Sequence, residues 1–254
     1  MPIALLREVS PSFADAIVAH GDRRPDVARA IEQHSVYRRA LDAAGYSVEV
    51  LPGDADHPDC VFIEDAAVVI GEIAVATRPG AEERRGEVGA VADRLARSMP
   101  VRSVEEPGTL DGGDVMVING TVYVGRSKRS NDSGIRQLAD IAATQGMPLV
   151  SVPVSEVLHL KSAVLPVASD TVVVTPGTVD ESLLEGLRIV HEAAHERHRF
   201  SALPLADGSL LVTANAEDTA GMLSDLGMRP VPIDVSEIQA ADGGLTCMSI
   251  LFER

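Results

Sequence analysis

Residues 115–154 read VMVINGTVYVGRSKRSNDSGIRQLADIAATQGMPLVSVPV. Two short segments rich in β-branched residues, 115–118 and 122–124, lie on either side of an Asn-Gly pair, which favours a tight hairpin turn. Apolar residues at helical spacing then predict a helix over roughly 130–146, and residues 150–154 predict a third strand. The stretch therefore predicts a strand, turn, strand, helix, strand unit.

The same order of elements recurs about five times, at a spacing near 50 residues that is typical of repeated supersecondary units. Further helices are expected at roughly 25–44, 81–98, 182–198 and 217–227, and further strands at 48–51, 61–63, 67–70, 73–76, 172–175 and 210–213. A doubly wound α/β sheet competes, but it predicts single strands between helices and a glycine-rich first turn, and the dinucleotide-binding and P-loop glycine motifs are both missing. With no Pro/Gly/Ser-rich linker, residues 1–254 are expected to form a single domain.

The composition describes an acidic globular protein. Of 254 residues, 45% are hydrophobic, enough for a substantial core, and 22 Lys and Arg against 38 Asp and Glu give a net charge of −16. Such a surface does not suit nucleic acid and attracts a small cationic molecule. No apolar run approaches the ~18–20 residues of a membrane span, so a cytoplasmic protein without membrane contact is expected.

Cysteine chemistry is limited to one site at most. The two cysteines, Cys60 and Cys247, are too few for a disulfide framework or a structural zinc site. Cys247 follows a Gly-Gly turn at the mouth of a strand, in the stretch DGGLTCMSI at 242–250. A lone cysteine is more often a small buried apolar residue. His159, between two leucines on a strand-like stretch, offers the base that a thiol nucleophile needs.

Two acidic clusters complete the candidate residues. The stretch DCVFIED at 59–65 is expected to end an apolar strand in two adjacent carboxylates, and LDGGD at 110–114 places two more around a diglycine turn. Charges at such places are often solvated turn residues. Adjacent carboxylates are also what a guanidinium requires, because its planar N–H groups match carboxylates bidentately.

Together these segments resemble the dimethylarginine dimethylaminohydrolases, a family of the guanidine-modifying (pentein) superfamily that includes the arginine deiminases. The matching segments are 62–65, 78–82, 84–87, 110–114, 127–129, 159–162 and 242–249. The resemblance implies a five-bladed α/β propeller of ββαβ modules, the pentein fold. It also implies hydrolysis of Nω-methylated L-arginines (asymmetric dimethylarginine, monomethylarginine) to L-citrulline and dimethylamine or methylamine through a covalent cysteine adduct, with no cofactor or metal. A homodimer is compatible with this reading.

The resemblance also implies a role for each candidate residue. Cys247 corresponds to the nucleophile, His159 to the general acid/base and Asp111 to the carboxylate that orients the histidine. A second set would hold the guanidinium, the amino-acid end and an apolar lid over the substrate: Asp65, Glu64, Asp59, Arg84, Arg129 and Ile17. The lid is expected over 13–25, with Gly21 as a hinge. Many relatives carry Ala-Ala-Asn-Cys where this chain has FSALP at 200–204, which puts the strand geometry there in doubt.

Three other functions stay open at this point. An arginine deiminase would share the thiol, the histidine and the carboxylates, but that family is typically much longer. HEAAH at 191–195 matches the zinc-protease motif, in which a helix places two histidines, here His191 and His195, one turn apart. The expected apolar seam of that helix leaves both histidines on a solvated stripe, which favours a chance match. A silent binder of arginine-like ligands would not need both Cys247 and His159.

Overall fold

The computed structural model describes residues 1–18, 23–197 and 199–253. These residues form five three-stranded sheets, and in each sheet the middle strand pairs antiparallel with one neighbour and parallel with the other. The repeated unit predicted from 115–154 is therefore confirmed. The chain divides into two compact units, Met1–Ile63 with Ala193–Arg254, and Glu64–Glu192. The single domain over 1–254 stays a prediction.

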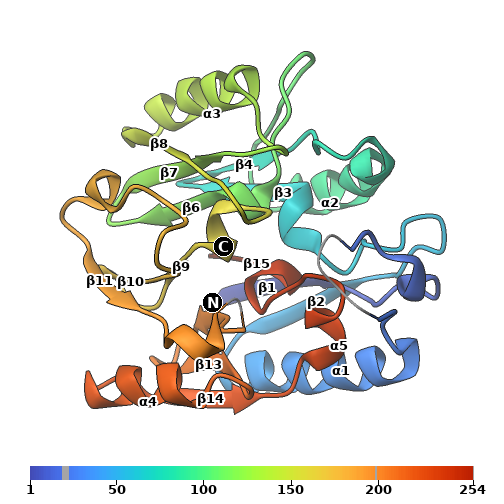
Figure 1. The fold of residues 1–254 in the computed structure, drawn as a ribbon. Helices are drawn as coiled ribbons and strands as arrows, with labels where there is room; N and C mark the ends of the chain where they lie inside the picture. The colour runs from blue at the N-terminus through green and yellow to red at the C-terminus, as the bar shows by residue number, and fades with distance from the viewer. Residues whose placement is uncertain (19–22, 198, 254) are drawn as a thin grey trace. The chain divides into compact units, whose positions relative to one another are not determined.

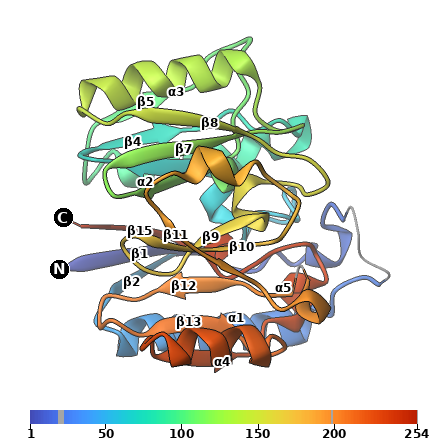
Figure 2. The ribbon, with the colours of Figure 1, turned by 60° about the vertical axis from the view of Figure 1, so that its left-hand side comes forward.

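The unit Glu64–Glu192 contains three sheets. Its strands are β3 (Ala67–Ile70), β4 (Ile73–Ala76), β5 (Val101–Ser103), β6 (Val115–Ile118), β7 (Thr121–Arg126), β8 (Leu149–Pro153), β9 (Val164–Pro166), β10 (Thr171–Val174) and β11 (Arg188–His191). Helix α2 (Val88–Leu95) connects β4 to β5, and α3 (Asp132–Thr144) connects β7 to β8. Helix α3 lies along the β6–β7–β8 sheet (Figures 1 and 2).

Local sequence explains why the 115–154 segment folds as predicted. Asn119 and Gly120 both have positive φ values, 50° and 72°, as a type I′ hairpin turn requires. Asn131 caps α3 by accepting a hydrogen bond from the Gly134 backbone N–H. Leu138 on α3 is fully buried in a cluster with strand valines such as Val122. Turn, cap and apolar spacing therefore agree on one structure.

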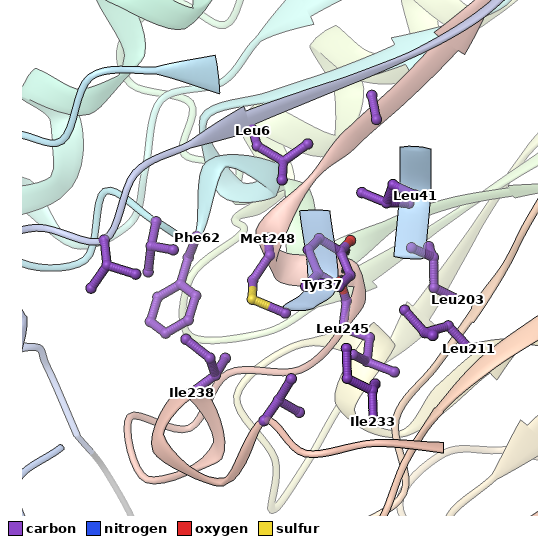
Figure 3. Packing of buried hydrophobic residues seen from close by; sticks show 14 of the residues in the cluster. Leu6, Tyr37, Leu41, Phe62, Leu203, Leu211, Ile233, Ile238, Leu245 and Met248 are labelled. Atoms are coloured by element: carbon purple, nitrogen blue, oxygen red, sulfur yellow. Dashed lines mark hydrogen bonds between the residues drawn. The ribbon is translucent and has the colours of Figure 1, made fainter. Parts of the chain in front are cut away.

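The unit that joins the two ends of the sequence contains the other two sheets. Its strands are β1 (Pro2–Arg7), β2 (Ser47–Leu51), β12 (Ala202–Pro204), β13 (Leu210–Thr213), β14 (Pro230–Ile233) and β15 (Ile250–Glu253), and its helices are α1 (Val27–Ala43), α4 (Glu217–Asp225) and α5 (Ser236–Gln239). The first and last strands, β1 and β15, are antiparallel neighbours (Figure 2). Figure 3 shows the core of this unit, where Tyr37, Phe62, Leu245 and Met248 pack together. The part of the chain described here has no helix long and apolar enough to cross a membrane.

Two expected elements are wrong. Residues 182–198, the last of which lies outside the described residues, do not form a helix: a short 3-10 segment, η6 (Glu181–Leu184), is followed by strand β11. Gly186 has a φ of +86°, which interrupts a helix, and the β-branched residues after it pair in parallel with β10. Residues 61–63 form no strand, because this buried apolar run enters a 3-10 turn, η2 (Ile63–Ala66).

Several short strands were absent from the expected set. Three of them, β9, β12 and β14, contain proline, and each is the outer strand of its sheet. Proline lacks a backbone N–H, so it is tolerated at a sheet edge although it lowers the strand signal in sequence. Strand β12 also covers most of the divergent 200–204 segment, which therefore keeps its place in a sheet.

Candidate active site

The centre of the candidate site in the Glu64–Glu192 unit is the buried pair His159 and Asp111. Asp111 precedes the 3-10 turn η4 (Gly112–Asp114), and His159 precedes another 3-10 turn, η5 (Leu160–Ser162). The expectation that His159 lies on a strand is therefore wrong. The His159 Nε2 atom lies 3.0 Å from Asp111 Oδ2. Its other ring nitrogen, Nδ1, lies 3.9 Å from Asp65 Oδ1, which is ion-pair distance but beyond a hydrogen bond.

These carboxylates keep His159 protonated. Burial alone lowers the pKa of His159, but the charge of Asp65, the hydrogen bond to Asp111 and the charge of Asp114 raise it to about 9. The imidazole is therefore a cation at neutral pH, with its Nδ1 proton available for donation. A buried histidine in this state is suited to general acid catalysis.

Asp65 is fixed by groups on three sides. Arg84 donates from Nη1 to Asp65 Oδ2, and the Gly113 backbone N–H donates to Oδ1 at 2.9 Å. Arg84 also binds Glu87 bidentately, at 3.0 and 2.7 Å. Burial raises the pKa of Asp65, but His159 and Arg84 outweigh it and hold that pKa well below its usual range. Asp65 is therefore an anion placed beside a cationic ring.

Asp114, which has no role assigned from the sequence, holds the His159 segment in place. Its Oδ1 accepts the Leu160 backbone N–H at 2.9 Å, and its Oδ2 accepts the hydroxyls of Ser127 and Ser130, both at 2.6 Å. Burial raises the pKa of Asp114, while His159 and these hydrogen bonds oppose the rise. The residue after His159 is thus tied directly to the turn that follows Asp111.

Arg129 and the Gly80 backbone also bind the Asp111 carboxylate. The Gly80 backbone N–H donates to Asp111 Oδ1 at 2.8 Å, and Arg129 Nη1 contacts Oδ2 at 3.3 Å. The Asp111 backbone N–H donates in turn to the Ser130 hydroxyl at 3.1 Å. The carboxylate is fully buried, so these contacts fix its direction as well as its charge.

Two glycines let this network close. A Cβ on Gly113 would lie 2.5 Å from His159 Nδ1 and 2.8 Å from Asp65 Oδ1, and a Cβ on Gly112 would lie 1.9 Å from the Glu64 carbonyl oxygen. No larger residue fits without moving the acid or the histidine. The diglycine of LDGGD is therefore a packing requirement of the site.

Glu64 forms an ion pair with Lys161, a residue that has no role assigned from the sequence. Lys161 Nζ donates a hydrogen bond to Glu64 Oε1, and each side chain is 12% exposed. Glu64 and Asp65 lie in η2 rather than at the end of a strand, so the expected local structure there is wrong although the two acids are adjacent to the site. The ammonium group offsets the charge of Glu64 and leaves Asp65 and Asp111 as the carboxylates beside the imidazole.

In the other unit, Cys247 lies in a 3-10 turn, η8 (Thr246–Met248), directly before β15. Its side chain is half-buried, and the Gly244 backbone N–H donates to Sγ at 3.3 Å. Two side chains bind the backbone of Leu245, just before this turn. Tyr37 on α1 donates to its carbonyl oxygen, and Ser201, the residue before β12, accepts from its N–H. The thiol thus sits in a turn with its sulfur directed by a backbone amide, as expected for a strand mouth.

The same unit holds Asp59 and Ile17, which were predicted to bind substrate. The Ile17 backbone N–H donates to both oxygens of the buried Asp59, each at 3.2 Å. The Ile17 side chain is 40% exposed, as an apolar lid residue needs to be. The expected hinge, Gly21, lies outside the described residues.

The described residues include two sets that could hold a metal ion. In one, ligand atoms of Asp65, Asp111 and His159 lie within 4.8 Å of one another. Arg84 contacts the Asp65 carboxylate of this set and Arg129 contacts the Asp111 carboxylate. In the other, His195, Glu196 and Asp218 are close, but both Glu196 oxygens accept hydrogen bonds from the start of α4.

The helix assumed for HEAAH is not formed. His191 ends strand β11 and pairs with Glu181 at 2.9 Å, whereas His195 lies in a 3-10 turn, η7 (Ala194–Glu196), and pairs with Asp218. Both histidine side chains are more than half exposed. The zinc-protease geometry, two histidines one helical turn apart, is therefore absent from this segment.

Known proteins similar to this chain identify its family. A family model described as N,N dimethylarginine dimethylhydrolase, eukaryotic, matches residues 15–199. The N(G),N(G)-dimethylarginine dimethylaminohydrolase of Streptomyces coelicolor is 43% identical over 251 residues, which is 97% of this chain and 95% of the relative. This chain belongs to the dimethylarginine dimethylaminohydrolase family.

Solved structures of dimethylarginine dimethylaminohydrolases share its fold along the whole chain. A cysteine-to-serine variant of the Pseudomonas aeruginosa enzyme, complexed with citrulline, matches with a TM-score of 0.94 and 30% identity over 98% of both chains. A histidine-to-glycine variant, in an adduct with S-methyl-L-thiocitrulline, matches with a TM-score of 0.93 and 31% identity over 98% of both chains. The predicted family and the predicted fold class, an α/β propeller of ββαβ modules, are confirmed.

Proposed function

We propose that Cys247 and His159 perform in this chain the hydrolysis of Nω-methylated L-arginines to L-citrulline and dimethylamine or methylamine. The observation that carries the proposal is the buried His159 imidazolium between Asp111 and Asp65, in a member of the dimethylarginine dimethylaminohydrolase family. The two family structures support it, because one binds citrulline in a cysteine variant and the other holds an S-methyl-L-thiocitrulline adduct in a histidine variant.

The first half of the reaction forms the covalent adduct. The Cys247 thiolate attacks the central guanidinium carbon, a C–S bond forms, and a tetrahedral adduct results. His159 Nδ1 donates its proton to the methylated nitrogen, because Nε2 is bound to Asp111. The C–N bond then breaks, neutral dimethylamine or methylamine leaves, and a planar S-alkylthiouronium remains on Cys247.

The second half of the reaction regenerates the enzyme. His159, now neutral, takes a proton from water, and the resulting hydroxide equivalent adds to the thiouronium carbon. The C–S bond then breaks and the thiolate leaves. The hydroxyl proton of the tetrahedral adduct passes to solvent, where the released amine takes it up, and the product is the neutral ureido group of L-citrulline. The net change is addition of one water to the substrate and release of one amine, with no oxidation or reduction. Asp111 keeps the ring oriented and supports its cationic form in both halves.

Substrate recognition follows from charge and from the remaining predicted residues. The guanidinium is a cation and Asp65 is held as an anion, so Asp65 and Glu64 are assigned to its N–H groups. Arg84 and Arg129 are assigned to the amino-acid carboxylate, and Arg129 is the more exposed of the two, at 15% against 5% for its side chain. Asp59 and Ile17 are assigned to the lid side of the substrate, as their direct contact allows.

Trapping the intermediate tests the chemical roles. Protein quenched by acid during turnover of asymmetric dimethylarginine should carry a substrate-derived mass on the peptide that contains Cys247. Cys60→Ser is the matched control, because Cys60 is 1% exposed and its Sγ lies near the backbone carbonyls of Glu8 and Asp54, and it should keep both adduct and activity. An adduct on another residue, or full activity in Cys247→Ser, would remove Cys247 from the mechanism.

Iodoacetamide and a chelator separate this mechanism from a zinc hydrolase. Alkylation should abolish activity, whereas a chelator should leave it unchanged. The reverse result would support the metal. A protein that binds methylarginine tightly and forms no citrulline would be a silent binder.

Substrate preference needs a direct comparison of four compounds. We propose that asymmetric dimethylarginine and monomethylarginine are hydrolysed well and arginine poorly, since a site that pairs fewer N–H groups tolerates methyl groups. Citrulline formation from arginine, monomethylarginine and both dimethylarginine isomers, measured side by side, decides the matter. Arginine turning over as fast as the methylated substrates would indicate a deiminase. A cytoplasmic location and a homodimer remain predictions.

A further inference from the structure

The turn that carries Cys247 is held by two side chains from distant parts of the same unit. Ser201 binds the backbone N–H of Leu245, and Tyr37 binds the Leu245 carbonyl oxygen. We propose that Ser201 and Tyr37 are positioning residues for Cys247, which set the direction of its sulfur without touching the substrate. The inference rests on the proposed role of Cys247 as the nucleophile.

Ser201 holds the N–H side of the turn. The Leu245 N–H donates to Ser201 Oγ at 2.8 Å, and Ser201 is 8% exposed. The backbone of Ser201 is itself fixed by Thr213: the Ser201 N–H donates to Thr213 Oγ1 at 3.1 Å, and the Thr213 N–H donates to the Ser201 carbonyl at 3.0 Å. The hydroxyl is therefore presented from a rigid strand end rather than from a mobile loop.

Tyr37 holds the carbonyl side from the inner face of α1. Its hydroxyl donates to the Leu245 carbonyl oxygen at 2.9 Å and lies 2.7 Å from Ser249 Oγ. Because the phenol has a single proton, the Ser249 hydroxyl donates in the second bond. Tyr37 is fully buried in the apolar cluster of Figure 3, beside Leu245 and Met248. It thus fixes residues on both sides of Cys247.

The neighbouring glycines leave the turn little freedom to shift. A Cβ on Gly244 would lie 2.6 Å from Ser201 Oγ, and a Cβ on Gly243 would lie 2.3 Å from the Phe62 ring. The Gly244 N–H is also the donor to Cys247 Sγ. The groups that fix the Gly244–Leu245 segment therefore fix the amide that directs the sulfur. Removing one of the two hydroxyls should let the turn relax and misalign the thiolate.

The test compares Tyr37→Phe and Ser201→Ala with a matched control, Ser209→Ala. Ser209 is also 8% exposed, and its hydroxyl donates to Asp207 at 2.6 Å in a turn before β13. We expect each positioning variant to lower kcat by about 10- to 100-fold, as small misplacements of a reacting group do, with KM for asymmetric dimethylarginine within about 3-fold of wild type. The control should keep wild-type kcat and KM.

A second readout separates positioning from loss of stability. The rate at which iodoacetamide alkylates Cys247, measured well below the Tm of each variant, should change in both positioning variants and not in the control. A lower Tm with unchanged kcat and unchanged alkylation would show a merely structural role and overturn the inference. So would equal losses in kcat and in substrate affinity.

The outcomes for Cys247 itself keep this inference distinct from the proposed function. Full turnover in Cys247→Ser would refute the nucleophile, and with it the premise of the inference. An inactive Cys247→Ser together with wild-type kinetics in Tyr37→Phe and Ser201→Ala would leave the nucleophile in place and refute the positioning role alone.

Discussion

Replacing Asp111 with asparagine should lower the pKa of His159 and move the alkaline limit of activity to lower pH. Asp111 raises that pKa in two ways, by its hydrogen bond to Nε2 and by its charge. Asparagine has nearly the same shape, so the change removes the charge while it keeps a polar group beside the ring. The charges of Asp65 and Asp114, which raise the pKa of His159, and burial, which lowers it, all remain in the variant.

The size of the effect follows from the shift. The pKa of His159 is raised from 6.5 to about 9 in the folded protein. At pH 7.5 the ring is then about 97% protonated, whereas a ring returned to its ordinary pKa would be only roughly 10% protonated. Loss of protonation should therefore lower kcat/KM at pH 7.5 by up to about 10-fold, the full loss requiring a return of the pKa to 6.5, and activity should recover as the pH is lowered toward 6. Poorer orientation of the ring lowers the rate at every pH, so the diagnostic result is the movement of the alkaline limb.

The same shift predicts how stability depends on pH. A raised folded-state pKa stabilises the folded protein, by about 3 kcal/mol for a shift of this size. This contribution is complete below pH 6.5 and is lost as the pH rises through about 9. The difference in unfolding free energy between wild type and Asp111→Asn should therefore be largest below pH 6.5.

Citrulline formation between pH 5.5 and 10, in wild type and in Asp111→Asn, is the assay. Asp132→Asn is the control, because this exposed carboxylate pairs with Arg126 on the surface. The wild-type and control profiles should both fall near pH 9, and the Asp111→Asn profile should fall at a lower pH, because only Asp65 and Asp114 remain to raise the pKa of His159. An alkaline limb that stays near pH 9 in Asp111→Asn would refute the assignment of that limb to His159.

Other changes test the remaining parts of the site. Gly113→Ala should lower kcat by more than about 10-fold, because its Cβ would lie 2.5 Å from His159 Nδ1; wild-type kinetics would mean that the ring has room to move. Lys161→Met should destabilise the protein by roughly 3–5 kcal/mol in a denaturant titration, because it removes the ammonium group beside the largely buried Glu64 carboxylate. Adding Glu64→Gln to the same chain should restore most of the lost stability. An unchanged unfolding midpoint in Lys161→Met would contradict this prediction. His191→Ala should leave citrulline formation within about 2-fold of wild type, because the side chain is 52% exposed and pairs with Glu181 on the surface; loss of activity would reopen the zinc hypothesis.

Local signals in the sequence were sufficient for the regular modules. The Asn-Gly turn before β7 and the Asn131 cap of α3 each specify their structure within a few residues. The helix prediction for 182–198 was wrong because the structure there depends on a partner distant in sequence. The residues after Gly186 pair in parallel with β10, and that pairing outweighs the helical spacing of the apolar residues.

The site was predictable in part, and for a different reason. Asp111 and His159 are 48 residues apart, and no local pattern brings them together, so family resemblance carried that pairing. The segments that carry the resemblance do not include the residues that support the cysteine turn. Tyr37 and Ser201 reach Leu245 across 208 and 44 residues, and each looks like an ordinary core or loop residue in sequence.

The pairing of β1 with β15 has a consequence for the order in which the enzyme matures. Strand β15 follows the cysteine turn directly, and its partner β1 lies at the opposite end of the sequence. Contacts between such remote segments form late in folding, because the intervening chain must first be brought together. A chain under synthesis has therefore made all of Glu64–Glu192, with its acid network, before Cys247 exists. We expect refolding followed by pulsed hydrogen exchange to show amide protection in Glu64–Glu192 before activity returns, and simultaneous recovery of the two would contradict this. On this expectation the cysteine turn is completed last, and a partly folded chain without that turn has no positioned thiol to act on substrate.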